Sequence, residues 1–217
     1  MQLDDREIRR LYAYPSEVGR PWVRSNFVAT LDGAAHAEDG RSGSLGGAID
    51  TRVFETVRVL SDVILVGAGT ARTEGYGPAP RPIAVVSRSL DIPERLLVPG
   101  QVVITSGDAP ADAVARLREK LEVIAVGDGR IDWPAVLAEF VRRGWRRVLC
   151  EGGPSLHGEL VGLDLVDEVC LTIAPVLASG QAPRISHGPE AVDRPMTLGH
   201  AIQADGVLLT RWVRDRT

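Results

Sequence analysis

The sequence predicts an α/β fold: a mostly parallel central sheet, helices on both faces and an antiparallel C-terminal hairpin. Short apolar runs alternate with amphipathic segments, which is typical of a parallel sheet covered by helices. Near the end, Asp205-Gly206 separates two strand-like runs, a strong hairpin signal. The chain has 217 residues, of which 44% are hydrophobic, enough for one sizeable core. Neither a break in composition nor an internal repeat is evident, so we expect a single domain over residues 1–217.

The first half of the chain contains the clearest helical periodicity. Ile49, Val53, Val57 and Leu60 recur every three or four residues and place one apolar stripe on a helix. Before them lies the glycine-rich stretch 32–47, and a segment of that length rarely lacks structure without a functional reason. The expected elements are helix Asp5–Tyr12, strand Trp22–Ala29, helix Ile49–Leu60, strand Asp62–Val66 and strand Pro82–Ser87.

The second half continues the alternation and carries clear helix boundaries. Asp132 can cap a helix, Pro134 suits its first turn, and Gly144 suits its end. The expected elements are strand Gln101–Thr105, helix Ala111–Lys120, strand Leu121–Val126, helix Asp132–Arg143, strand Arg146–Cys150, helix Pro154–Leu163, strand Val166–Ile173, and the hairpin strands Thr197–Ala204 and Val207–Val213.

Composition argues against several classes of protein. The net charge is −4 and no basic stripe stands out, which disfavours nucleic-acid binding. Apolar runs such as Val63–Val66 are too short to cross a bilayer, and Met1–Arg10 lacks the apolar core of a signal peptide. Cys150 and Cys170 lie in apolar strands, which favours buried free thiols over a disulfide or metal pair. We therefore expect a cytoplasmic protein that binds neither membranes nor nucleic acids.

Two apolar strands run into glycine-rich turns of similar design. They are Val63–Thr70 and Val148–Leu156, and each ends on a hydroxyl residue near an expected helix start. Glycine lets a ligand approach the backbone, and the free N–H groups of a helix start favour phosphate. Carboxyl ends of strands are also where open α/β sheets bind ligands. Neither turn is a P-loop or the dinucleotide fingerprint, so a phosphorylated-nucleotide site competes here with two simple tight turns.

Other polar residues follow strands in the same way. Ser87 and Arg88 could grip a 2′-phosphate and so select NADPH over NADH, although Arg88 could equally be a solvated surface residue. Asp32 could face a substrate or form a turn with Gly33. Glu151, beside two glycines at the end of an apolar strand, has no obvious surface role.

Hydrolase and metal chemistry find little support. The four histidines are scattered without metal-ligand spacing, and no serine lies in a nucleophile elbow. We therefore expect no metal site.

Four motifs match one known family in its own order. They are Ser25–Gly33 (SNFVATLDG), Arg58–Thr70 (RVLSDVILVGAGT), Glu151–Leu156 (EGGPSL), and Gly162–Val169 followed by Ala174–Leu177. From Arg20 to Trp212 the chain resembles the riboflavin-biosynthesis reductase domain. That domain forms the C-terminal half of bifunctional deaminase–reductases and also occurs alone. The sequence contains no zinc deaminase segment, so deamination is not expected of it.

This resemblance implies a dihydrofolate-reductase-like fold, NADPH as cofactor and usually a homodimer. Family members reduce the ribosyl group of 5-amino-6-(5-phosphoribosylamino)uracil to a ribityl chain. By position, Asp32 and Glu151 become the expected catalytic residues, with Glu151 orienting the substrate and either Asp32 or water supplying a proton. The implied cofactor residues are Val28, Gly67, Gly69, Thr70, Ser87, Arg88, Gly152, Gly153, Ser155 and Leu156, and the implied substrate residues are Asn26, Asp32, Ser42 and Glu151.

The substrate half of the chain departs from the family pattern. Ser44 stands where many members have tryptophan, and Thr51 where they have an arginine, while Arg52 is expected to point elsewhere on the helix. Glu74–Pro78 replaces a stretch that often begins Asp-Asp-Pro. The departures leave two alternatives open: a reductase of dihydrofolate or another pterin, and a non-catalytic NADPH-binding protein. A phosphate-binding cation near Ser42 and Thr51 would favour the phosphorylated pyrimidine.

Overall fold

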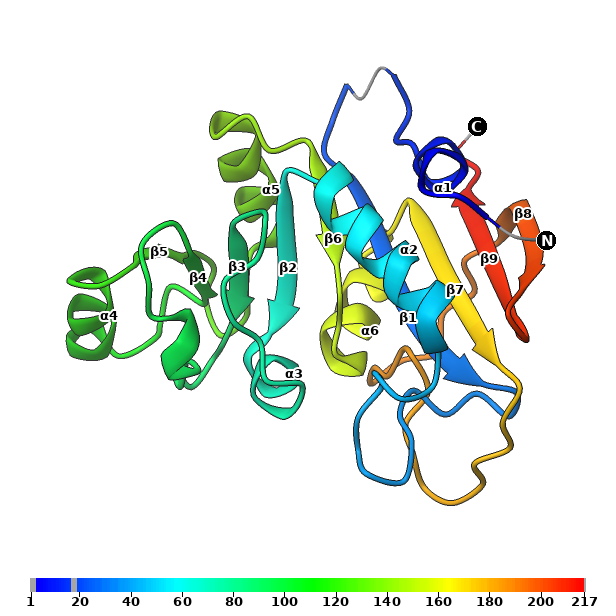
Figure 1. Cartoon of the computed structure of the whole chain (residues 1–217). Helices are drawn as coiled ribbons and strands as arrows, with labels where there is room; N and C mark the ends of the chain where they lie inside the picture. Colours follow the sequence, from blue (N-terminus) through cyan, green and yellow to red (C-terminus); the bar gives the residue numbers. More distant parts are fainter. Residues whose placement is uncertain (1–2, 17–18, 217) are drawn as a thin grey trace.

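The computed structural model of the chain describes residues 3–16 and 19–216 and contains one nine-stranded sheet (Figure 1). The strand order is β5-β4-β3-β2-β6-β1-β7-β9-β8. Neighbours from β5 to β7 are parallel, whereas β9 is antiparallel to both β7 and β8. The expected mostly parallel sheet with an antiparallel C-terminal hairpin is confirmed.

The elements follow the expected order, with ends that shift by a few residues. The strands are β1 (Trp22–Thr30), β2 (Val63–Gly67), β3 (Ile83–Val86), β4 (Val102–Thr105), β5 (Glu122–Ala125), β6 (Arg147–Cys150), β7 (Glu168–Ala174), β8 (Met196–Ala204) and β9 (Val207–Arg214). The helices are α1 (Asp5–Leu11), α2 (Gly47–Leu60), α3 (Ala68–Thr73), α4 (Ala111–Arg118), α5 (Trp133–Arg142) and α6 (Pro154–Gly162), with a 3₁₀ turn at Glu94–Leu96.

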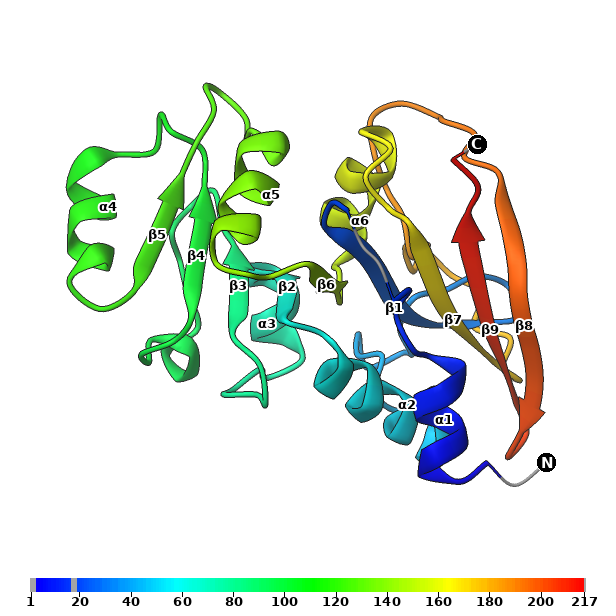
Figure 2. The same ribbon diagram turned by 90° about the horizontal axis from the view of Figure 1, so that it is seen from above.

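Helices cover both faces of the sheet, as expected. Figure 2 shows α1 and α2 on one face and α5 and α6 on the other. The apolar stripe of α2 packs in one core with Ile8 of α1 and with Tyr12, which directly follows α1. Trp133 and Phe140 of α5 pack with Leu160 of α6 in the second core, on the opposite face.

Local signals in the sequence account for several element ends. The Asp132 carboxylate accepts a hydrogen bond from the Ala135 N–H and caps α5, as expected. The hairpin turns at Asp205 and Gly206, whose φ values of 48° and 86° are both positive, as a two-residue hairpin turn requires. The short helix α3 was expected only as a turn before a helix start, because six residues are too few to reveal helical periodicity.

Strand β6 joins the two halves of the sheet. It comes late in the chain but pairs with β2 on one side and β1 on the other. In this register Leu65 lies opposite Cys150, so the glycine turns that follow β2 and β6 are neighbours. This crossover positions the candidate site at the carboxyl ends of β2, β6, β1 and β7.

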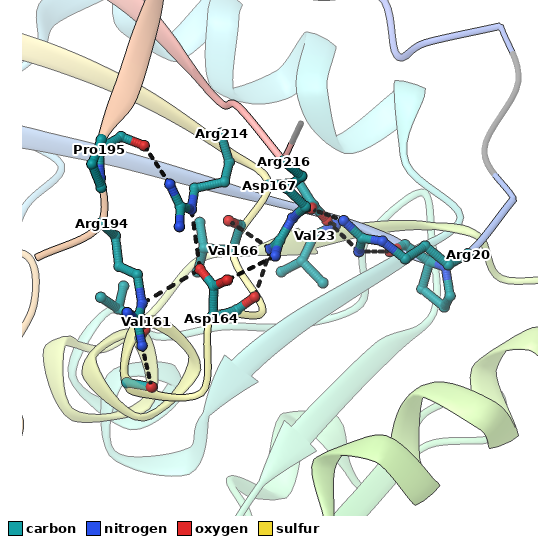
Figure 3. Close-up of polar contacts among 12 residues, drawn as sticks. Arg20, Val23, Val161, Asp164, Val166, Asp167, Arg194, Pro195, Arg214 and Arg216 are labelled. Atoms are coloured by element: carbon teal, nitrogen blue, oxygen red, sulfur yellow. Dashed lines mark hydrogen bonds and ion pairs between the residues drawn. The ribbon is translucent and has the colours of Figure 1, made fainter. Parts of the chain in front are cut away.

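At the amino ends of the parallel strands, opposite the glycine turns, arginine side chains surround the carboxylates of Asp164 and Asp167 (Figure 3). Asp167 is buried and also accepts the backbone N–H of Val23 at 2.9 Å. The network ties the end of β9 to the turn before β7, away from the glycine turns. Arg20 and Arg216 contact Asp167, and Arg194, Arg214 and Arg216 contact Asp164.

Two further expectations concern the cysteines and membranes. Cys150 and Cys170 are both buried and free, as expected. Within the described residues, no helix combines the length and apolar character needed to cross a membrane.

Candidate functional site

The two glycine turns form one continuous surface. The Gly67 N–H donates to the Gly152 carbonyl at 2.7 Å, and the Glu151 N–H donates to the Leu65 carbonyl at 2.9 Å. Helix α3 begins directly after the first turn and α6 directly after the second. Two helix starts, each with unpaired N–H groups, therefore lie side by side on neighbouring strands.

Neither glycine of the second turn has room for a side chain. Gly152 has a φ of +85°, and a Cβ there would lie 2.8 Å from the ring of Phe27. A Cβ on Gly153 would collide with the hydroxyl of Thr70. Both positions of the turn are therefore restricted to glycine, next to Ser155 and Leu156 in the first turn of α6.

Strand β3 is parallel to β6 and two positions away from it, so the carboxyl ends of both strands lie on the same side of the sheet. Ser87 is buried, and its hydroxyl lies 3.5 Å from that of Ser89. Arg88 is exposed and makes no hydrogen bond or ion pair with any described residue. An unpaired guanidinium at this edge is available to an anionic ligand.

A cavity of about 400 Å³ lies between the 127–134 segment and α6. Ser155, Glu159 and Leu163 are spaced by four residues, so the cavity and the turn share one side of the helix. The indole N–H of Trp133 donates to Glu159 at 2.8 Å and fixes one wall. None of the residues that line the cavity was expected as a site residue: Gly127, Asp128, Arg130, Ile131, Asp132, Trp133, Pro134, Glu159 and Leu163.

Glu151 is buried on the α2 face and is fully engaged within the chain. The guanidinium of Arg58 donates to both carboxylate oxygens at 2.7 Å, and the Tyr76 hydroxyl donates to one at 2.6 Å. Arg58 also stacks on Phe54, 4.1 Å from the ring centre. Burial, then the negative charge of Glu151, raises the pKa of Tyr76 well above its usual value. No local pattern indicates this partnership, because Arg58 lies 93 residues before Glu151.

Asp32 joins two loops at the end of β1. Its carboxylate accepts hydrogen bonds from the Thr30 hydroxyl and from the N–H groups of Ala178 and Ser179. The Thr30 hydroxyl, then these two amides, lowers the pKa of Asp32 to about 2. The residue stays ionised at neutral pH and acts here as an acceptor that anchors the 176–180 loop.

Ser42 faces an anion rather than a cation. Its N–H and hydroxyl both donate to one oxygen of Glu74 at 2.8 Å. Thr51 donates to the Gly47 carbonyl, and Arg52 pairs with Asp5, away from Ser42 as expected. Among the described residues no cation contacts Ser42 or Thr51.

The remaining expected residues lie on β1 facing α2. Side chains alternate along a strand, and Arg24 reaches the Tyr12 carbonyl of α1, so Asn26 and Val28 face the same side. Val28 lies opposite Thr172 of β7. This face thus brings together Asn26, Val28 and Glu151, while Phe27 points to α6 and contacts His157.

Open α/β sheets commonly bind ligands where strands run into helix starts, which is the arrangement of the two joined glycine turns. The chain matches the model of the RibD C-terminal domain over residues 21–208. It belongs to that family, as the sequence motifs implied.

Relatives agree with this assignment. The 2,5-diamino-6-ribosylamino-4(3H)-pyrimidinone 5′-phosphate reductase of Methanothermobacter thermautotrophicus is 31% identical over 80% of this chain and 87% of its own length. A pyrimidine reductase-like protein from Corynebacterium diphtheriae has a similar structure, with a TM-score of 0.81 and 23% identity over 97% of this chain and 99% of its own.

The expected dihydrofolate-reductase-like fold is also confirmed. Dihydrofolate reductase from Enterococcus faecalis, solved with NADP(H), matches 89% of this chain and 96% of its own with a TM-score of 0.53 and 13% identity. At that identity the likeness concerns the fold alone.

Proposed function

We propose that the chain is an NADPH-dependent reductase that reduces the ribosyl group of 5-amino-6-(5-phosphoribosylamino)uracil or a close analogue. The observation that carries this proposal is the surface formed by the two joined glycine turns in a RibD C-terminal domain. Its relatives are named as reductases of the corresponding pyrimidinone phosphate. One reductase domain spans residues 1–217.

The cofactor is proposed to lie along the carboxyl edge of the sheet. Its pyrophosphate is proposed to lie over Gly67, over Gly69 and Thr70 in the first turn of α3, and over Gly152 and Gly153 of the second turn. Ser155 and Leu156 add N–H groups from the first turn of α6. The cavity along α6 has room for the adenosine end, and the other end reaches Val28 on β1. When bound, the reduced nicotinamide supplies the hydride.

Arg88 supports a preference for the phosphorylated cofactor. Its guanidinium is exposed, unpaired among the described residues and next to the buried Ser87. Together they offer a charge-assisted grip on a 2′-phosphate.

The substrate is proposed to lie beside the start of α2, over Asn26 and Val28. Asn26 is partly exposed and makes no side-chain hydrogen bond with any described residue, so its amide is free to orient the substrate. Glu151 borders the same space, held by Arg58 and Tyr76. Ser42 reaches a substrate phosphate only if Glu74 moves, because that carboxylate occupies both of its donors.

A binding and turnover experiment tests the proposal. NADPH at a concentration 100 times its Kd should stabilise the protein by about 2.7 kcal/mol in thermal unfolding. NADPH oxidation is then followed with 5-amino-6-(5-phosphoribosylamino)uracil and, separately, with dihydrofolate. Turnover of the uracil compound supports the proposal. Turnover of dihydrofolate alone would identify a pterin reductase, and binding without any turnover would identify a non-catalytic NADPH-binding protein.

We further propose a homodimer in the cytoplasm. The outer strand β8 exposes one unpaired edge and Leu198, which is 47% exposed, and two buried free cysteines suit a reducing compartment. Light scattering during size-exclusion chromatography should give about twice the chain mass of 23.3 kDa. A mass of one chain at micromolar concentration would contradict the dimer.

A further inference from the structure

Asp50 is a carboxyl group that the proposed function has not used. It lies in the first turn of α2 and is partly exposed. The hydroxyl of Thr172 on β7 donates a hydrogen bond to it. Thr172 is the cross-strand partner of Val28 on β1. Asp50 therefore stands on the face that carries Asn26 and Val28, where the substrate is proposed to bind.

The loop before α2 is shaped around this carboxyl group. Gly46 is buried, and a Cβ there would collide with the carboxylate of Asp50. The glycine therefore lets the side chain fold back beneath the 33–47 loop while one side stays open. A group in this position can touch a bound substrate.

No cation neutralises Asp50. None of the ion pairs among the described residues includes it. Burial raises the pKa of Asp50, and the Thr172 hydrogen bond offsets this only in part. The ionisable groups around Asp50 come from four segments. Tyr12 follows α1, and Cys170 lies on β7. The two arginines already have partners: Arg24 of β1 pairs with Glu168 of β7, and Arg58 of α2 pairs with Glu151.

The two expected catalytic carboxylates, Asp32 and Glu151, differ from Asp50 because each accepts several hydrogen bonds. Asp32 accepts three hydrogen bonds, and its pKa of about 2 leaves about one molecule in 10⁵ protonated at pH 7. Both oxygens of Glu151 already accept hydrogen bonds, from the guanidinium of Arg58 and the hydroxyl of Tyr76. Both carboxylates are therefore occupied as acceptors within the chain.

We propose that Asp50 is the catalytic residue that donates the proton in the reduction. This role rests on the proposed function and names the acid of the same site. The substrate's open-chain imine accepts a hydride on the C=N carbon from the reduced nicotinamide. The π electron pair moves to nitrogen, which takes the proton of the Asp50 carboxyl group. The products are the amine, the oxidised nicotinamide and the Asp50 carboxylate, which water reprotonates.

The test compares Asp50→Asn with the wild type across pH. In the wild type, kcat should fall tenfold per pH unit above the pKa of Asp50, because the acid form is lost. Asp50→Asn should lower kcat by about 100-fold or more and lack that break, with the Kd for NADPH unchanged. Asp112→Asn, an exposed carboxylate on α4 far from the site, is the matched control and should keep the wild-type kcat and profile.

A second measurement needs no turnover. Carbon-13 NMR of carboxyl-labelled protein without ligands should show one aspartate whose pKa is raised above 3.8, and that signal should be missing in Asp50→Asn. An ordinary pKa for Asp50 would overturn the inference even if Asp50→Asn did not fold.

The outcomes separate this inference from the function on which it rests. A wild-type protein that turns over no substrate refutes the proposed function and this role with it. An active wild type whose pH break survives in Asp50→Asn, or disappears in Asp32→Asn or Glu151→Gln instead, refutes the role of Asp50 alone.

Discussion

The N–H of Gly67 donates to the carbonyl oxygen of Gly152 at 2.7 Å and joins the two glycine turns into one surface. The two residues are 85 positions apart in the chain (152 − 67). Only the insertion of β6 between β2 and β1 brings them together. The joined surface depends on a backbone geometry that a side chain on Gly152 would disturb.

Gly152→Ala is therefore expected to lower the free energy of unfolding by about 2–4 kcal/mol. Its positive φ disfavours alanine, and the new methyl group would press on Phe27. Gly162→Ala, at the end of α6, is the matched control: its Cβ meets open space, so stability should stay the same or rise slightly. Urea unfolding measures both, and equal stabilities would contradict the role of Gly152.

Arg88→Ala should weaken NADPH binding by about 10- to 100-fold and leave NADH binding unchanged. The lost interaction is a charge-assisted hydrogen bond to the 2′-phosphate, which NADH lacks. Fluorescence titration with each cofactor gives the two Kd values. Arg116→Ala, an exposed arginine on α4, is the control and should change neither. An equal loss for both cofactors would place Arg88 elsewhere on the dinucleotide.

The secondary structure could be predicted because its signals are local. The stripe of α2, the Asp132 cap and the Asp205-Gly206 turn each act within a few residues. The glycine turns were identified in the same way, from the strands that precede them. The surface that the two turns form together could not be predicted from the sequence, because it depends on where β6 inserts in the folded sheet.

The hydrogen-bond partners of the site residues could not be predicted either, because they come from distant parts of the chain. Arg58 and Tyr76 engage Glu151, and Glu74 engages Ser42, through contacts between segments far apart in sequence. Asp50 carries no motif, and its isolation from any cation appears only once α2 is packed on the sheet. The cavity beside Trp133 had one available signal, the glycines that follow the expected strand at 121–126.

Asp32→Asn should loosen the 176–180 loop without unfolding the protein. An amide offers one acceptor oxygen where the carboxylate serves three donors, so the N–H groups of Ala178 and Ser179 should exchange roughly tenfold faster. Amide hydrogen exchange followed by NMR measures this. Asp39→Asn, which alters a cap in the 37–41 turn, should leave both rates unchanged.

The same bonds predict a pH dependence for Asp32. Its pKa is depressed in the folded protein, to about 2 from 3.8. The stabilisation is therefore complete above about pH 4 and is lost as the pH falls towards 2. Protection of Ser179 that did not change across this window would argue against the carboxylate as its acceptor.

His157 should make the protein less stable in mild acid. The ring is buried in α6 against Phe27, its Nδ1 lies 3.0 Å from the Ile185 carbonyl, and Nε2 has no partner among the described residues. Burial lowers the pKa of His157 to about 4 from 6.5. Between these values the unfolded chain binds a proton that the folded chain does not. Stability is thus complete above pH 6.5 and decreases as the pH falls to 4, by about 3 kcal/mol in all.

Urea unfolding between pH 7.5 and 4.5 measures this slope. His157→Gln should be less stable at pH 7.5, because it replaces a buried ring packed on Phe27, yet it should lose less stability on acidification than the wild type. His187→Gln, at an exposed position, should retain the wild-type slope. Because burial also lowers the pKa of His200, a smaller slope should remain in His157→Gln and decrease further when both rings are replaced. A slope that His157→Gln leaves unchanged would mean that the ring is protonated equally in the folded and unfolded chains, which its burial against Phe27 and its unpartnered Nε2 oppose.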